Sequence, residues 1–232
     1  MKHLQPLIPA TFLRRDNRFR ATVQVRGSEQ WAHVANSGRL QDLLTPERPV
    51  YLHPASKPAR KTPYDLKLVQ LPQTLVSIDA RLPNPLFAQA VAAGQLPAFN
   101  YPHIQPEVRY GQSRLDFRLS GPEGVCWVET KSVTLVQQGV ARFPDAPTAR
   151  GSRHLQELMA IRAQGEQAAV VFIIQRSDAT RFAPAAAVDA LFAQRLRQAA
   201  AAGVAVRAYV CQISLTEITL AREIPVILHD CE

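Results

Sequence analysis

The stretch CWVETKSVTL, residues 126–135, combines the features of a core strand with two charged side chains. Its apolar residues, among them Trp127 and Val133, are typical of a strand that packs in a protein interior. Residues i and i+2 of a strand point to the same face, so Glu129 and Lys131 lie next to each other on the face of Trp127. A core would favour two more apolar residues there, which makes this charged pair the feature to explain.

The segment before this stretch predicts a partner strand for it. Residues 113–119 alternate as a strand does, and GPEG at 121–124 supplies a turn, so the two strands form a hairpin. Counting back from the turn places Leu119 opposite residue 126 and Asp116 opposite Glu129. Asp116 and Glu129 are therefore expected to be cross-strand neighbours.

Two adjacent carboxylates have two possible explanations here. Repulsion raises the pKa of one of them unless a cation intervenes, and a divalent ion such as Mg²⁺ takes such oxygen ligands. Lys131 would then orient a water or stabilise charge on a phosphate. The alternative is an ion pair between Glu129 and Lys131 on an exposed face, with Asp116 paired to Arg114 or Arg118.

Residues 83–232 predict an α/β domain with a mixed central sheet, because helical and strand patterns alternate along them. Thr148 is placed as the N-cap of a helix that ends near Arg162, and Gly94 is placed to end an earlier helix. The run AAVVFIIQR is typical of a buried central strand. The expected helices are 86–93, 148–162 and 187–202, and the expected strands are 107–110, 113–119, 125–135, 168–176 and 204–213.

Residues 1–82 predict a small β-barrel. In residues 19–26, Phe19, Ala21, Val23 and Val25 alternate with polar residues that include Arg20 and Arg26, as in a half-buried strand with a cationic outer face. Four further short strands are expected, and a short helical stretch is expected over residues 40–44. About five short strands in a unit of this size favour an OB-fold, which commonly binds oligonucleotides. The further strands are 30–35, 49–52, 65–71 and 74–78.

The positive charge is concentrated in the first part of the chain. Lys and Arg outnumber Asp and Glu by 27 to 19, a net charge of +8. Residues 1–82 hold 13 basic and 6 acidic side chains (+7), whereas residues 83–232 hold 14 and 13 (+1). Such an excess fits a polyanionic partner, because basic groups that face phosphates release counterions. A basic surface without a partner remains the alternative.

Membrane and disulfide features are not expected in this sequence. No apolar run reaches the roughly 20 residues that a membrane helix needs. The opening MKHLQPLIPATFLRR does not have the pattern of a signal peptide. Cys126, Cys211 and Cys231 fit neither a disulfide framework nor a zinc site, so we expect a protein of the reducing cytoplasm that does not bind membranes.

Several long segments together resemble a known family. These are NSGRL (36–40), PEVRYGQSRLDF (106–117), WVETKSVTL (127–135) and FPDAPTARGSRHLQELM (143–159). They are similar to the sugar fermentation stimulation protein A family of bacteria and archaea, and the resemblance runs from Phe12 to about Val226. It implies an OB-type domain, residues 1–82, and a domain of the PD-(D/E)XK nuclease fold, residues 83–232. It also implies DNA binding and a link to the regulation of sugar (maltose) metabolism.

The resemblance implies roles for the charged residues of the hairpin. Asp116 matches the first acidic position of the nuclease motif, and Glu129 and Lys131 match its (D/E)XK pair. Glu107 fits an upstream acid that some such nucleases use as a further metal ligand, and Thr130 would offer its backbone carbonyl. The implied cofactor is Mg²⁺ or Mn²⁺.

A second group of residues is expected to contact nucleic acid. Arg150, Arg153 and His154 fall in the first turns of a helix, where a bound phosphate would be favourable; surface arginines paired with Asp145 or Glu157 are the alternative. Gln175 ends a buried strand, where it is either a polar active-site residue or a surface glutamine. The predicted contacts are Arg20, Arg26, Asn36, Arg39, Arg114, Arg150, Arg153 and His154.

Two functions follow from these observations. The first is a DNA-binding protein without strong sequence preference that cleaves through a metal site. The second is a DNA-binding regulator of sugar metabolism that keeps the nuclease fold without cleaving. The sequence leaves open RNA as the substrate, the preferred DNA structure and the oligomeric state.

Overall fold

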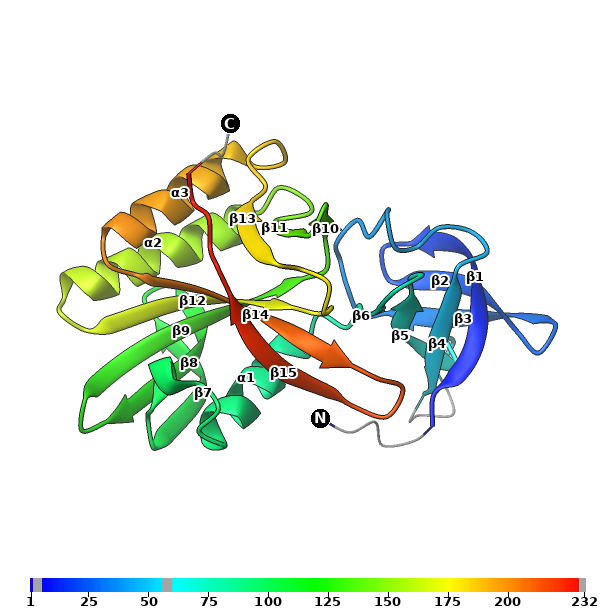
Figure 1. Cartoon of the computed structure of the whole chain (residues 1–232), viewed down its shortest axis with the longest axis horizontal. Helices are drawn as coiled ribbons and strands as arrows, with labels where there is room; N and C mark the ends of the chain where they lie inside the picture. The colour runs from blue at the N-terminus through cyan, green and yellow to red at the C-terminus, as the bar shows by residue number, and fades with distance from the viewer. Residues whose placement is uncertain (2–5, 56–59, 230–232) are drawn as a thin grey trace.

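The computed structural model describes residues 1, 6–55 and 60–229, which form two lobes (Figure 1). The N-terminal lobe consists of β-strands, and the second lobe surrounds a larger sheet with helices. In these described residues no helix is long and apolar enough to cross a membrane.

The first lobe is a closed barrel. Its strands follow the order β3-β2-β1-β4-β5-β6, and a parallel pairing of β3 with β5 closes the first five into a barrel. Phe12, Leu52 and Leu66 are buried in its core. This architecture confirms the predicted OB-like domain. The strands are β1 (Ile8–Asn17), β2 (Arg20–Val25), β3 (Ser28–Val34), β4 (Pro49–Pro54), β5 (Tyr64–Gln70) and β6 (Leu75–Ser77).

Three details of the barrel differ from the sequence prediction. The sequence did not predict β1, in which Phe12 is the one fully buried residue, so that the strand lacks an alternating pattern. The expected helix over 40–44 is a turn, because Leu40 has φ +51° and the N–H groups of Leu43 and Leu44 both bond its carbonyl. Phe19 lies in the β1–β2 turn before β2 begins, and it is 50% exposed instead of buried.

The second lobe is built on a six-stranded mixed sheet of order β15-β14-β12-β9-β8-β7. The central strand β12 is parallel to β9 and β14, and the other pairs are antiparallel, which confirms the predicted α/β lobe with a mixed sheet. Its elements are α1 (Pro83–Ala92), β7 (His103–Tyr110), β8 (Ser113–Gly121), β9 (Gly124–Val133), α2 (Ala149–Ala163), β12 (Gln167–Ile174), α3 (Ala190–Ala201), β14 (Ala205–Ile213) and β15 (Ile218–Ile224).

Helices cover both faces of this sheet (Figure 1). On one face, Leu158 of α2 and Leu196 of α3 pack with Trp127 and Phe172. On the other, Phe87 of α1 packs with Phe117 of β8. β15 and a small sheet were not predicted, because these strands are short or partly exposed. The small sheet consists of β10 (Val136–Gln137), β11 (Val140–Phe143) and β13 (Arg181–Pro184), and a 3-10 helix spans Pro97–Phe99.

The two predicted helix caps are present. The Thr148 hydroxyl accepts a hydrogen bond from the Gly151 N–H at 3.0 Å and so caps α2. Gly94 follows α1 with φ +66°, a conformation that glycine adopts without strain. These caps fix where α1 and α2 end and begin beside the sheet.

Gln175 joins the two lobes directly after β12. Its side-chain amide donates to the Asp79 carbonyl (3.1 Å) and the Ser132 hydroxyl (2.8 Å) and accepts from the Ser77 hydroxyl (2.7 Å). Its backbone carbonyl accepts from the Ser77 N–H at 3.0 Å. Gln175 is 0% exposed, so the interpretation as a surface glutamine is wrong. Both polar atoms of this side chain instead bond a residue that precedes the second lobe, so the side chain connects the two lobes.

Asp79, in the segment between the lobes, has an effect on stability that depends on pH. Burial alone would raise the pKa of Asp79, but Arg81 (2.6 Å) and Lys67 (2.7 Å) outweigh it and lower the pKa to about 2. Because the pKa is depressed on folding, the group stabilises the fold above the unfolded pKa of about 3.9, and this contribution is lost as pH falls toward 2.

We therefore expect Asp79→Asn to lower the free energy of unfolding at pH 7 by about 2 kcal/mol. The difference between variant and unaltered protein should shrink between about pH 4 and pH 2. Denaturant unfolding followed at several pH values measures this. A difference that stays constant across that range would contradict the assigned pKa.

Candidate metal and phosphate site

The predicted ligands meet in one cavity of about 440 Å³ in the second lobe and the segment that precedes it. Asp116 comes from β8, Glu129 and Lys131 come from β9, and Arg150 comes from the first turn of α2. The cavity lining also includes Arg81, Asn84, Glu107 and Thr130.

The hairpin has the predicted register and then opens at the site. Leu119 pairs with Cys126, and Phe117 pairs with Val128 as the last pair of the ladder. Beyond it, Asp116 Oδ2 accepts the Thr130 N–H at 2.8 Å and lies 3.0 Å from the Thr130 hydroxyl oxygen. The Asp116 carboxylate therefore takes the place of a backbone acceptor and lies beside β9.

Asn84, at the start of α1, completes the surroundings of Asp116. Its Nδ2 donates to Asp116 Oδ1 at 2.9 Å, and its Oδ1 accepts from the Thr130 hydroxyl at 2.5 Å. Burial and then the charge of Glu129 raise the pKa of Asp116, although the hydrogen bonds from Asn84 and Thr130 oppose this. Asn84 was not predicted, because its only sequence signal is its place in LPNP, at the beginning of a helix.

Glu129 has one satisfied and one unsatisfied oxygen. Oε1 accepts from Lys131 Nζ at 2.5 Å and from His154 Nδ1. Oε2 is buried and has no hydrogen-bond partner. Burial alone would raise the pKa of Glu129, but the charge of Lys131 and the His154 hydrogen bond outweigh it and lower the pKa. Glu129 is 3% exposed, so the alternative of an exposed Glu129–Lys131 pair is wrong.

His154 supports Glu129 and has no access to the surface. Arg150 Nε donates to His154 Nε2 at 3.3 Å, and a guanidinium can only donate, so Nε2 is the acceptor and Nδ1 carries the proton. Nδ1 therefore donates to Glu129 Oε1. His154 was expected to contact nucleic acid, but at 1% exposed its ring cannot reach a phosphate.

Glu107 lies at the rim of the cavity. It is exposed, has φ +57°, and accepts from Arg114 at 3.0 Å. Asp116 accepts from Asn84 and Thr130, so the alternative in which Asp116 pairs with Arg114 or Arg118 is wrong. The guanidinium of Arg114 instead forms an ion pair with Glu107.

The other predicted nucleic-acid contacts differ in their surroundings. Arg20 and Arg26 belong to β2 and the β2–β3 turn, where Arg20 pairs with Asp16 (3.2 Å) and lies 4.4 Å from the Trp31 ring centre. The side-chain amide of Asn36 is also occupied, because its Nδ2 donates to the Ile78 carbonyl and its Oδ1 accepts the Gly38 N–H. The remaining three, Arg39, Arg150 and Arg153, are exposed, and of these Arg150 lines the cavity with the two carboxylates.

The chemistry of these donors fits a hard divalent ion. The described residues contain no group of three or more His, Cys, Asp or Glu side chains that could hold an ion. Mg²⁺, however, usually takes only one or two protein carboxylates and completes its shell with water and phosphate. The buried Oε2 of Glu129 has no donor, and a cation would satisfy it. Asp116, Glu129 and the backbone carbonyl of Thr130 are the residues that fit.

Comparisons with known proteins agree over nearly the whole chain. The family model described as "SfsA N-terminal OB domain" matches residues 13–78, and "Sugar fermentation stimulation protein RE domain" matches residues 81–217. A sugar fermentation stimulation protein homolog of Moorella thermoacetica is 52% identical, over 92% of this chain and 94% of that protein. One of Desulforamulus reducens is 46% identical, over 96% and 93%.

A solved structure extends this similarity to three dimensions. The structure of Pyrococcus furiosus SfsA in complex with Ca²⁺ superposes with a TM-score of 0.91 at 34% identity, and the match covers 98% of each chain. The residues matched by the family models include the barrel and the hairpin with Asp116 and Glu129. The chain belongs to the sugar fermentation stimulation protein (SfsA) family.

Proposed function

We propose that this protein binds DNA in the cytoplasm and carries a metal-dependent phosphodiesterase site of the nuclease type. The observation that carries the proposal is the buried, unpartnered Oε2 of Glu129, next to Asp116 and Lys131 in one cavity. An oxygen in that state is costly unless a cation completes it. The Ca²⁺ bound by the Pyrococcus furiosus relative supports a divalent ion.

The residues of the chain have distinct roles in this proposal. Asp116, Glu129 and the Thr130 carbonyl would hold Mg²⁺ or Mn²⁺, with Glu107 at the rim as a further acid. Such an ion, when bound, polarises a phosphoryl oxygen and lowers the pKa of a coordinated water. Lys131, whose ammonium lies on Glu129 Oε1, is positioned to orient the attacking water or to stabilise phosphate charge.

Arg150 and His154 support this arrangement from α2. Arg150 is exposed in the cavity, so its guanidinium can contact a phosphate while its Nε holds His154. His154 in turn donates to Oε1 of Glu129, and Oε2 keeps no hydrogen-bond partner. Hydrogen bonds of this kind from supporting residues orient metal ligands and strengthen binding.

A second candidate is a DNA-binding regulator of sugar (maltose) metabolism genes that does not cleave. It is favoured by the ion pair between Lys131 and Glu129, because the charge of Glu129 is compensated there without a metal ion. In that case the site would be a structural ion pair within a retained fold. RNA as the nucleic acid is an alternative substrate that the same assays distinguish.

Metal-dependent cleavage tests the proposal. Supercoiled DNA, single-stranded DNA and RNA are incubated with the protein in Mn²⁺, in Mg²⁺ or in EDTA, and the products are separated on gels. We expect cleavage of DNA in Mn²⁺ or Mg²⁺ and none in EDTA. DNA binding without cleavage under every metal condition would favour the regulator, and cleavage that persists in EDTA would contradict the metal site.

A further inference from the structure

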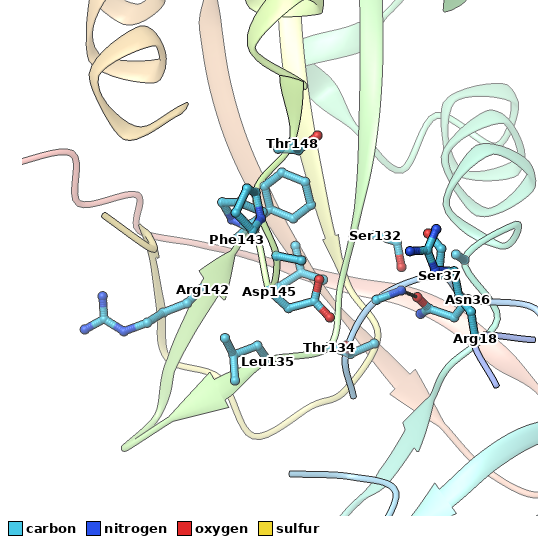
Figure 2. A pocket seen from close by; sticks show the side chains of 16 residues that line it. Arg18, Asn36, Ser37, Ser132, Thr134, Leu135, Arg142, Phe143, Asp145 and Thr148 are labelled. Atoms are coloured by element: carbon cyan, nitrogen blue, oxygen red, sulfur yellow. Dashed lines mark hydrogen bonds between the residues drawn. The ribbon is translucent and has the colours of Figure 1, made fainter. Parts of the chain in front are cut away.

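Three adjoining cavities form one groove between the two lobes, which we call the interdomain groove. The cavity with Asp116 and Glu129 shares Ala80 and Ser132 with a second cavity of about 360 Å³, shown in Figure 2. The second cavity shares four lining residues with a third of about 450 Å³ on the barrel. The groove therefore leads from the two carboxylates to the barrel. The four shared residues are Arg18, Ser37, Gly38 and Ala146.

The walls of the interdomain groove include two segments of the chain, NSGRL (36–40) and FPDAPTARG (143–151). They touch where Asp145 Oδ2 accepts the Arg39 N–H at 2.9 Å. A Cβ on Gly38 would lie 2.3 Å from the same oxygen, so only glycine allows this approach. Asn36 accepts the Gly38 N–H at 2.8 Å and braces the turn. The shape of the groove is therefore fixed by specific contacts across the two lobes.

The barrel end of the groove is cationic. The terminal nitrogens of Arg15 donate to four backbone carbonyls, so this residue has a structural role. The carbonyls are those of Arg18, Asn36, Gly38 and Arg39. Arg18 and Arg39 are exposed, and their guanidinium groups have no hydrogen-bond or ion-pair partner among residues 6–55 and 60–229. The third cavity has no acid in its lining, and the second has one, Asp145, whose Oδ2 accepts the backbone N–H of Arg39.

The middle of the groove is lined by small polar groups. Figure 2 shows Arg18, Asn36 and Ser37 on one side of the second cavity, with Asp145 and Thr148 across from them. Hydroxyl groups and arginines of this kind contact sugars and phosphates without reading base sequence. Each cavity has the volume of a small-molecule site, which admits a nucleotide unit.

We propose that a single strand of nucleic acid lies along the interdomain groove, with one phosphate at Arg18 and Arg39 and another at Lys131 and Arg150. This inference rests on the proposed function and specifies its substrate as single-stranded. The bases of a duplex are paired and stacked inside it, so a duplex cannot place single nucleotide units in a series of small cavities, whereas a single strand can follow them. The barrel then binds through its groove edge and not through Arg20 and Arg26.

Neutralisation of the two groove arginines tests the path. Binding of a fluorescein-labelled single strand of about 16 nucleotides, an upper site size for one OB-fold, is measured by anisotropy in EDTA, so that no cleavage occurs. We expect Arg18→Gln with Arg39→Gln to weaken binding at least about tenfold. The slope of log affinity against log salt should fall by about 0.7, the value for one lost phosphate contact to a single strand.

The matched control changes two exposed basic residues of the barrel outside the groove, Arg14→Gln with Lys61→Gln, and should leave binding within about twofold. An equal loss in the control pair would overturn the proposal, as would a duplex of the same length that binds as tightly and responds in the same way. Absence of binding by the unaltered protein would overturn it too. Because EDTA is present, this result does not depend on cleavage, so a wrong path for the strand is distinguishable from the absence of a working metal site.

Cross-linking locates the strand directly. Cys126 and Cys211 are buried, so Ser37→Cys in a Cys231→Ser background gives one accessible thiol in the groove. The control is Ser28→Cys, at the exposed first position of β3. A single strand that carries a disulfide-activated phosphate tether should cross-link to residue 37 and not to residue 28. Preferential cross-linking to residue 28 would contradict the path.

Discussion

Replacement of Glu129 by glutamine is expected to weaken Mn²⁺ binding more than about 100-fold, beyond the effect of losing a supporting residue, and to abolish metal-dependent cleavage. Glutamine has the same shape and still accepts from His154 through its oxygen, but it removes the negative charge and puts an amide nitrogen where the unpartnered Oε2 lies. Free Mn²⁺ measured by electron paramagnetic resonance gives the affinity directly, and cleavage of single-stranded DNA gives the activity.

The variant Asp116→Asn should show the same two losses, because its carboxylate is the second proposed ligand. Glu123→Gln is the matched control, since Glu123 is an exposed acid in the turn of the same hairpin and should leave Mn²⁺ affinity and activity unchanged. Unaltered Mn²⁺ affinity in both Glu129→Gln and Asp116→Asn would show that the ion binds elsewhere.

The second large effect is expected at His154. His154→Leu keeps a buried side chain of similar volume but removes the donor to Glu129 Oε1, so Mn²⁺ affinity should fall by about 10- to 100-fold. His154→Asn places its amide nitrogen near the position of Nδ1 and should recover most of that loss. Both affinities are measured by the same Mn²⁺ titration, without reference to activity.

The comparison of the two His154 variants separates orientation of Glu129 from simple packing. Thermal unfolding of both variants shows whether the helix α2 still packs on the sheet. If leucine and asparagine weaken Mn²⁺ binding equally, His154 has only a packing role, and the hydrogen bond to Glu129 contributes nothing to the site.

The sequence predicted the part of the site that depends on local geometry. The two-residue period of a strand places Glu129 next to Lys131, and the length of one turn places Asp116 across from Glu129, so a single hairpin determined all three positions. Asn84 and His154 come from α1 and α2, and their contacts depend on how these helices pack on opposite faces of the sheet. Periodicity carries no information about that packing.

The same distinction applies to the fold. The alternating strands of the barrel and the buried run of β12 were predicted, because one strand face or both are apolar along their length. β1 buries Phe12 completely but leaves its other residues half-buried or exposed, so its position depends on pairing with β2 and β4 and not on its own pattern. The turn at Leu40 depends on a positive φ that leucine rarely adopts.

The contacts of Gln175 also bear on how this protein could be recombined. Its amide is saturated by Ser77, Asp79 and Ser132, and Leu68 of the barrel packs in the same apolar cluster as Phe87 of α1. A barrel transplanted from a distant relative would leave buried donors and acceptors unpaired unless these partners were exchanged with it. The two lobes should therefore be exchanged together, and functional chimeras should be joined only at sites that preserve these contacts between the lobes.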